Sequence, residues 1–195
     1  MPDADAESES VRPLLSAGAI AGRVGQMGRE ITQHDAATID AGGDRQPLLV
    51  LVVMTGGLVF GADLIRQIDR PLHVGVLHAR SYPGRRRTAG ELSLATDMLP
   101  DLAGRRVLVV DDIFDTGATL AAIVAEVTGR GAASVATAVL LHKQVEHRTP
   151  LRPTYAGFTI ADEFVVGYGL DFDGRYRNLP HVGVLRRSAD GSSSR

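Results

Sequence analysis

The sequence predicts an α/β domain with a doubly wound, mostly parallel sheet flanked by helices. Apolar runs of strand length alternate along the chain with stretches of helical periodicity, which is the order that builds βαβ units. The runs Leu48–Met54 and Val107–Val110 contain no polar residue, as expected of parallel strands buried on both faces. With 195 residues, 44% of them hydrophobic, the chain fits one domain with a substantial core.

The first half of the chain supplies two helices and two strands. Ser16 is a suitable N-cap for a helix whose apolar side chains recur at helical spacing. These side chains are Ile20, Val24, Met27 and Ile31. The pattern fades before the glycine pair at 42–43, and the apolar strand 48–54 follows. We then expect a helix over 58–68 and a strand over 72–77.

The second half opens with an interruption. Between residues 79 and 104 the periodicity is lost, so we expect a long irregular or hairpin-like excursion of the kind that often forms a lid. The remaining predicted elements are a strand over 107–110, a helix over about 119–130, a strand over 135–141, and two further strands over 155–160 and 181–185. A loop over 162–180 joins the last two strands.

The ends and the composition narrow the classes of protein. Residues 1–10 and 188–195 are small, polar and charged, so we expect mobile tails around a single domain over 11–187. A net charge of −2 gives no general attraction to nucleic acid or to an anionic membrane. Cysteine is absent, which excludes disulfides and thiolate metal sites. We therefore expect a cytoplasmic protein without a nucleic-acid or membrane partner.

The most informative segment is DDIFDTGAT at 111–119, between the strand 107–110 and a predicted helix. At a helix start several N–H groups lack partners and the dipole favours anions, so main-chain donors and hydroxyls can bind a phosphate there. The neighbouring carboxylates suit the hydroxyls of a sugar. The alternative is a turn and N-cap that serve only the fold. A Walker-type phosphate loop is excluded because its motif is missing.

This segment resembles the ribose-5-phosphate loop of the type I phosphoribosyltransferases, which bind phosphoribosyl pyrophosphate (PRPP). The resemblance implies that Asp111 and Asp112 hold the ribose hydroxyls, directly or through Mg²⁺, and that Asp115 is the general base. The residues expected to hold the 5-phosphate are Thr116, Gly117, Ala118 and Thr119.

A second segment narrows the resemblance to the hypoxanthine-guanine phosphoribosyltransferases, from about Val11 to Leu185. DEFVVGYGLDF at 162–172, followed by RYRNLP at 175–180, is similar to the family's purine- and pyrophosphate-binding region. The implied roles are stacking on the purine by Phe164, backbone contacts to its edge by Val165, a place near base and Mg²⁺ for Asp171, and pyrophosphate binding by Arg177. Alternatively, Phe164, Val165 and Tyr168 simply form core at a strand edge.

Two more positions match. Lys143, after the strand 135–141, corresponds to the lysine whose ammonium donates to the purine O6, although a lone lysine is usually a surface charge. Ser81 and Tyr82 match the family's flexible Ser-Tyr lid. For the arginines at 85–87 beyond them we favour a solvated face over direct contact with phosphate. His142 and His147 suggest a metal pair, but no third ligand lies nearby in sequence.

The pyrophosphate loop departs from the family. Thr55 stands in Met54-Thr55-Gly56-Gly57 where the family usually has Lys or Arg. The family's loop binds pyrophosphate largely through backbone N–H groups. We therefore expect Thr55 and Gly56 to bind pyrophosphate despite the change of side chain. The replacement of Lys or Arg by Thr55 leaves open how tightly this loop binds pyrophosphate and how it contacts a neighbouring subunit.

The resemblance implies the type I phosphoribosyltransferase fold with a small C-terminal hood. It also implies a purine salvage enzyme that moves the phosphoribosyl group of PRPP to hypoxanthine or guanine, with Mg²⁺ as cofactor, in a homodimer or homotetramer. The ratio of hypoxanthine to guanine use stays open. An enzyme that transfers the group to xanthine or orotate would be expected to lack the FVVGY segment at 164–168. Two alternatives from other classes are a nucleotide-sensing, RNA-binding regulator, which should show a basic face, and a catalytically weak paralogue, for which Thr55 is the sole hint.

Overall fold

A computed structural model describes residues 9–42, 46–81, 92–95 and 99–187. Its helices are α1 (Ala17–Gly42), α2 (Leu58–Ile65) and α3 (Ala118–Gly129). The strands of its larger sheet are β2 (Leu48–Met54), β3 (Leu72–Ser81), β4 (Leu92–Ala95), β5 (Arg106–Phe114), β6 (Ser134–Lys143) and β7 (Tyr155–Ile160). The strands of its smaller sheet are β1 (Glu9–Leu15), β8 (Val165–Val166) and β9 (Val182–Arg187).

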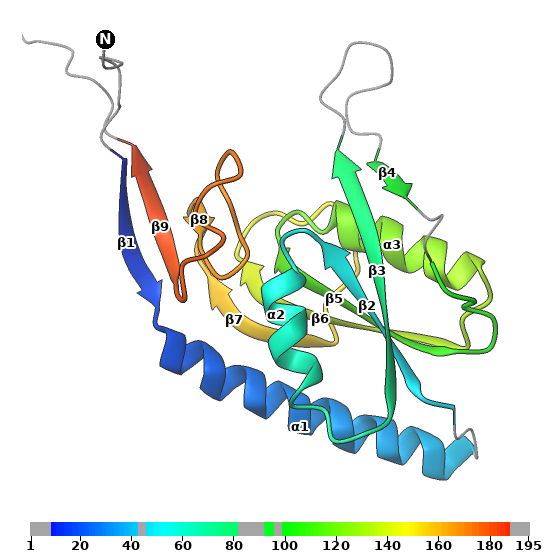
Figure 1. Ribbon diagram of the computed structural model, residues 1–195. Coiled ribbons are helices and arrows are strands. Elements are labelled where there is room, and N and C mark those ends of the chain that lie inside the picture. Colours follow the sequence, from blue (N-terminus) through cyan, green and yellow to red (C-terminus); the bar gives the residue numbers. More distant parts are fainter. Residues whose placement is uncertain (1–8, 43–45, 82–91, 96–98, 188–195) are drawn as a thin grey trace, which may run out of the picture.

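The larger sheet is the predicted doubly wound one. Its strand order is β4-β3-β2-β5-β6-β7, and all its pairings are parallel except that of β3 with β4. Helices α1 and α2 cover one face and α3 covers the other (Figure 1). Since the strand order runs outward in both directions from β2 and β5, the loops after these two strands open at the carboxyl edge of the sheet, where such folds bind ligands.

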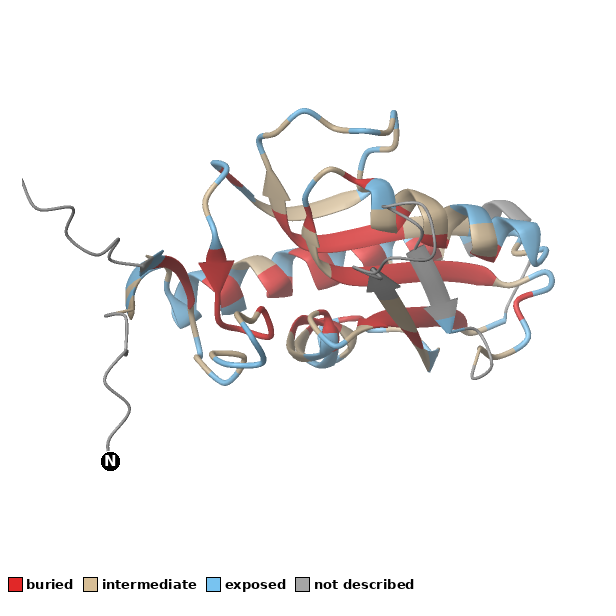
Figure 2. Ribbon diagram, turned by 90° about the horizontal axis from the view of Figure 1, so that it is seen from above, coloured by how far each residue is buried: buried red, intermediate tan, exposed pale blue. Residues whose placement is uncertain are grey.

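Strand β2 shows why the sheet needs helices on both faces. Its alternate residues Leu48, Val50 and Val52 pack in the cluster that contains side chains of α1 and α2. Leu49, Leu51 and Val53 pack in a second cluster with side chains of α3. All six are buried, and Figure 2 shows the strands of the larger sheet mostly in the colour of buried residues. The continuous apolar run is therefore a strand buried on both faces, as predicted.

The ends of several elements differ from the sequence prediction. Strand β5 continues to Phe114 because Ile113 and Phe114 pair with residues of β6. Asp111 and Asp112 are thus strand residues, and the turn after them is shorter than expected. Strand β3 runs to Ser81 and pairs antiparallel with β4, which agrees with a hairpin-like excursion. Helix α2 ends at Ile65, earlier than predicted.

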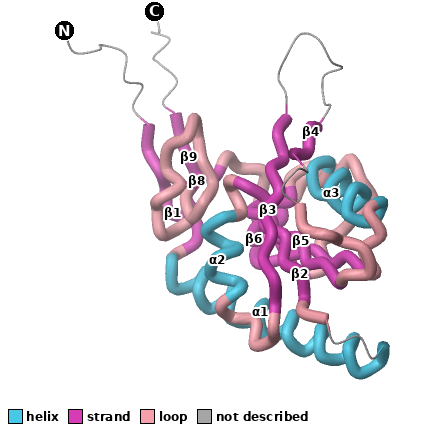
Figure 3. Tube along the Cα trace, turned by 45° about the vertical axis from the view of Figure 1, so that its right-hand side comes forward, coloured by secondary structure: helices cyan, strands magenta, loops and turns pink. Residues whose placement is uncertain are grey.

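The N-terminal strand was not predicted. The sequence was read as a tail up to residue 10, yet Glu9–Leu15 pairs antiparallel with β9, which also pairs with β8. These three strands stand beside the larger sheet as a separate small sheet, which we call the hood (Figure 3). The predicted C-terminal hood is correct, but it includes an N-terminal strand. The predicted tails at 1–8 and 188–195 lie outside the described residues.

No helix in the described part of the chain is long and apolar enough to cross a membrane.

Candidate active site

A cavity of about 230 Å³ opens at the carboxyl ends of β2 and β5. Its lining comes from the loop after β2, from β3 and, for the largest part, from the DDIFDTGAT segment. The lining residues are Val53, Met54, Gly56, Ala79, Asp111, Asp112, Ile113, Phe114, Asp115, Thr116, Gly117, Ala118, Thr119 and Leu120. Every residue that the sequence predicts to hold phosphoribose therefore faces one cavity, at the edge of the sheet expected for a ligand.

The turn between β5 and α3 is built for close approach of backbone. Gly117 is the residue before α3 and has φ +83°, a left-handed conformation that other residues rarely adopt. A Cβ at Gly117 would lie 2.6 Å from both Phe114 Cζ and Thr149 Cγ2. The N–H of Arg148 donates to the carbonyl of Thr116 at 2.8 Å. The loop after β6 thus packs against this turn and holds it. The first residues of α3, whose N–H groups lack partners within the helix, line the cavity.

Asp111, which is buried, and Asp112, which is half-buried, form an acidic pair. The Asp112 N–H donates to Asp111 Oδ1 at 3.0 Å, and Asp111 is only 7% exposed. Burial raises the pKa of Asp111 well above its ordinary value, and the adjacent charge of Asp112 raises it further. Burial also raises the pKa of Asp112, against the lowering effects of hydrogen bonds and of Arg177. Two such carboxylates facing a cavity suit a hard divalent cation, which takes oxygen ligands.

The loop after β2 meets this acidic pair. A Cβ at Gly56 would lie 1.9 Å from Asp112 Oδ2, so the backbone of Gly56 rests on that carboxylate. The peptide bond between Met54 and Thr55 is cis, and the Thr55 side chain is exposed. Gly56 also meets the loop between β8 and β9 of the hood, because a Cβ at Gly169 would lie 2.3 Å from the Gly56 carbonyl oxygen.

Lys143 connects the two halves of the site. Its side chain is 11% exposed at the end of β6. The ammonium lies 3.1 Å from Asp162 Oδ1, in the segment after β7, and 3.7 Å from Asp115 Oδ2, in the turn after β5. The ammonium is therefore one of the points where the two segments singled out by sequence come together. The sequence assigns Asp162, the nearer partner, no role of its own, because nothing in the sequence links it to Lys143.

The aromatic residue of the C-terminal segment is accessible. Phe164 is 54% exposed, and the ring of Phe172 meets it edge-on with centroids 5.7 Å apart and planes at 90°. Val165 and Tyr168 are buried in the core. The structural alternative is thus correct for the side chains of Val165 and Tyr168, while Phe164 presents a free ring surface of the kind that stacks on a flat heterocycle.

Arg177 lies between acids. Its Nη2 is 2.7 Å from Asp171 Oδ1, its Nη1 donates to the Gly169 carbonyl at 2.6 Å, and its charge lowers the pKa of Asp112. The other oxygen of Asp171 accepts from the Gly174 N–H at 2.8 Å. Among the described residues no group of three His, Cys, Asp or Glu side chains could hold a metal. The described residues therefore do not bring Asp111, Asp112 and Asp171 together as one metal-binding set, and Asp171 is instead paired with Arg177.

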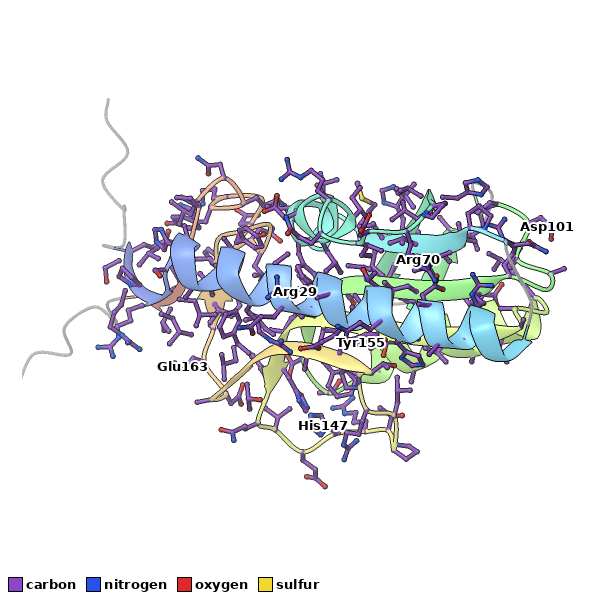
Figure 4. All side chains as sticks on the ribbon, turned by 90° about the horizontal axis from the view of Figure 1, so that it is seen from below. Arg29, Arg70, Asp101, His147, Tyr155 and Glu163 are labelled. Atoms are coloured by element: carbon purple, nitrogen blue, oxygen red, sulfur yellow. The ribbon has the colours of Figure 1, made fainter. Side chains whose placement is uncertain are left out.

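The histidine pair is part of the packing. His142 and His147 have ring centroids 5.1 Å apart, and both rings also contact Phe114 beneath the turn after β5. Figure 4 shows His147 on the loop after β6, the loop that also holds Thr116. Sequence gave no sign of this loop's supporting role, since its contacts join residues about 30 positions apart. Ser81 ends β3, whereas Tyr82 and the arginines at 85–87 lie outside the described residues.

Comparisons with known proteins match this arrangement. A family model described as the phosphoribosyl transferase domain matches residues 25–173. The hypoxanthine-guanine phosphoribosyltransferase of Streptococcus pneumoniae is 36% identical over 180 residues, which are 92% of this chain and 96% of that protein. The enzyme of the same name from Lactococcus lactis is 43% identical over 138 residues, 71% of this chain and 75% of that protein. A bifunctional protein of Listeria innocua is 35% identical over 173 residues, but these are only 26% of its length.

Solved structures agree with the sequences. A hypoxanthine phosphoribosyltransferase from Staphylococcus aureus superposes with a TM-score of 0.79 at 31% identity, over 90% of this chain and 91% of that one. A mutant hypoxanthine phosphoribosyltransferase from Trypanosoma cruzi, solved as a ternary complex with substrates, gives a TM-score of 0.80 at 31% identity, over 90% of this chain and 95% of that one.

Proposed function

The chain belongs to the phosphoribosyltransferase family, among the hypoxanthine-guanine phosphoribosyltransferases, and we propose that it transfers the 5-phosphoribosyl group of PRPP to hypoxanthine or guanine. The products are IMP or GMP and pyrophosphate. The observation that carries this proposal is the Lys143 ammonium, which lies between Asp115 of the phosphoribose cavity and Asp162 of the purine segment. The alternatives of an RNA-binding regulator and a weak paralogue have no such support.

Binding of PRPP follows from the cavity. The 5-phosphate would meet the hydroxyls of Thr116 and Thr119 and the N–H groups around Gly117 and Ala118, where the dipole of α3 favours an anion. The carboxylates of Asp111 and Asp112 would face the ribose hydroxyls. Their burial makes their charge costly, and a Mg²⁺ held by these two carboxylates would offset that cost with its positive charge.

Pyrophosphate leaves from the side where the loop after β2 meets the hood. The backbone at Thr55 and Gly56 and the guanidinium of Arg177 lie around this junction, and Arg177 can hold the departing oxygens as a bidentate donor. To do so it has to share or release Asp171. Asp171, once freed, is the carboxylate that we propose to join base and metal binding when substrates enter.

The purine would lie between Phe164 and Lys143. Phe164 offers its ring face, Val165 offers backbone groups at the purine edge, and the ammonium donates to O6. As the new bond forms between the ribosyl C1′ and the purine N9, the bond from C1′ to the pyrophosphate oxygen breaks. The purine proton leaves to Asp115, the general base toward N7, which is 52% exposed at the rim of the cavity. Ser81 and Tyr82 are proposed to close over the site and exclude water.

The test is an assay of nucleotide formation from each common nucleobase with PRPP and Mg²⁺. IMP and GMP are expected. Nucleotide from orotate or uracil, or none from any base, would contradict the proposal. A homodimer or homotetramer and a cytoplasmic location are further parts of the proposal, checked by sedimentation and by fractionation of cells.

A further inference from the structure

The ring of Phe164 is supported by a chain of contacts that begins on the N-terminal strand. Phe172 meets the Phe164 ring edge-on, and the guanidinium of Arg175 lies 5.5 Å from the centroid of Phe172. Arg175 Nη2 in turn donates to Glu9 Oε1 of β1 at 3.0 Å. Four side chains thus connect β1 with the platform proposed to carry the purine.

Glu9 holds the same turn at a second point. Its other carboxylate oxygen accepts from the Tyr176 hydroxyl at 2.6 Å, and Arg175 also lies 5.5 Å from the centroid of the Tyr176 ring. Two backbone hydrogen bonds between Phe172 and Arg175 close this turn. The Glu9 side chain is only 14% exposed, so it is enclosed by these contacts. One carboxylate therefore fixes the turn on which Phe172 stands.

A second arm of β1 reaches the other side of Phe164. Arg12 Nη2 donates to Glu163 Oε1 at 3.0 Å, and Glu163 directly precedes the platform residue. Figure 4 shows Glu163 near the N-terminal end of α1, the helix that β1 leads into. The main chain of Phe164 is held by β9, because its carbonyl accepts from the Leu185 N–H at 2.9 Å. The chain of contacts from Glu9 through Arg175 and Phe172 thus reaches the ring, whereas Arg12 anchors the residue before it.

We propose that β1 positions the purine platform: Glu9, through Arg175 and Phe172, fixes the orientation of the Phe164 ring and so sets the affinity for the purine base, while Arg12 anchors Glu163, the residue before it. This inference rests on the proposed function. The physical reason is preorganisation, because a half-exposed ring that is free to rotate has to be ordered when the base binds, and that cost reduces affinity. Glu9, Arg12 and Arg175 touch no substrate and are positioning residues.

The inference distinguishes base binding from stability. The Arg175 side chain is 53% exposed, so its ion pair with Glu9 should contribute little to folding, and the hood keeps the β1–β9 pairing when the pair is removed. None of the residues that line the cavity for PRPP belongs to this chain of contacts. The expected effect is therefore a higher KM for the base alone.

The experiment compares Glu9→Ala, Arg175→Met and their double variant with the unmodified protein. We expect KM for hypoxanthine to rise about threefold to tenfold in each single variant, while kcat and KM for PRPP change less than about twofold. The double variant should lose no more than the larger single effect, because both residues act through one chain of contacts. Glu126→Ala is the matched control, since it removes the partner of Arg130 in an exposed ion pair on α3 and should change neither KM.

Three results would overturn the inference: an unchanged KM for hypoxanthine in the single variants, an equal rise in both KM values, or additive effects in the double variant. Hydrogen exchange of segments 163–165 and 171–177 reads the same contacts without turnover, and faster exchange in Glu9→Ala is expected. Unchanged exchange would contradict the positioning role. Absence of nucleotide formation by the unmodified protein would instead contradict the proposed function, so the two failures are distinguishable.

Discussion

The backbone of Gly56 rests on the carboxylate of Asp112. A Cβ at Gly56 would lie 1.9 Å from Asp112 Oδ2 and 2.6 Å from its Cγ. Through this contact the loop proposed to hold pyrophosphate and an acid proposed to hold ribose fix each other's position. Any side chain at residue 56 has to displace the carboxylate.

Gly56→Ala should therefore weaken PRPP binding while the protein stays folded. We expect KM for PRPP to rise at least about tenfold, because catalytic geometry tolerates little misplacement. The steady-state KM and the melting temperature check it. Gly129→Ala is the control: residue 129 ends α3 with open space around its Cα, so alanine there should be neutral. Normal PRPP kinetics in Gly56→Ala would show that the contact does not matter for binding.

Asp115→Asn tests the general base. Turnover should fall about 10²–10⁴-fold, the usual range for losing such a group, with little change in PRPP binding. Asp162→Asn is the matched control, because it removes the nearer partner of Lys143 but no proposed base, and a much smaller loss of kcat is expected. Near-normal turnover in Asp115→Asn would remove Asp115 from the mechanism.

Asp111 and Asp112 together should govern the binding of PRPP with its metal. The double replacement by Asn removes both negative charges from the cavity, so the affinity for PRPP in the presence of Mg²⁺ should fall strongly. Calorimetric titration with and without Mg²⁺ measures it. Equal affinity in the double variant and the unmodified protein would leave these residues with a structural role only.

The same burial predicts a gain of stability in the metal-free protein. Since burial raises the pKa of Asp111, its contribution to stability is present at low pH and is lost as the pH rises through the folded-state value. Asp111→Asn carries no such charge and keeps the oxygen that accepts from the Asp112 N–H. At pH 7 without Mg²⁺ its melting temperature should rise by about 2–4 °C, the shift that roughly 1 kcal/mol gives in a domain of this size. A lower melting temperature would contradict this.

Much of the fold could be predicted because many of its features depend on residues that are close together in the sequence. The apolar run of β2, the N-cap at Ser16 and the turn at Gly117 each depend on neighbouring residues, and the structure has all three. Strand β1 was missed because its pairing with β9 joins the two ends of the chain, and a short strand containing Pro13 carries no clear alternation. The extension of β5 to Phe114 likewise depends on its partner β6.

In the site, too, single loops could be predicted from sequence, whereas the contacts between them could not. Resemblance pointed to Asp115, Lys143 and Phe164 one loop at a time, and the ion pair that joins the first two appears only in three dimensions. The supports of the site, Phe172 beside the platform and Arg148 beneath the phosphate turn, have no local signature. A tertiary contact of this kind can be found only when both partners are placed.

The most direct test of the account is the catalytic efficiency of the unmodified protein with adenine and with hypoxanthine. The Lys143 ammonium has three donors and no acceptor, so it can meet the O6 of hypoxanthine but faces another donor in the amino group of adenine. Adenine should be used at least about a hundredfold less efficiently, since an unpaired buried donor costs about 1–3 kcal/mol and sites built on such a bond discriminate further. Lys143→Ala should narrow the gap, mainly by damaging the use of hypoxanthine. Comparable efficiencies for the two bases in the unmodified protein would contradict both the role of Lys143 and the assignment to 6-oxopurines.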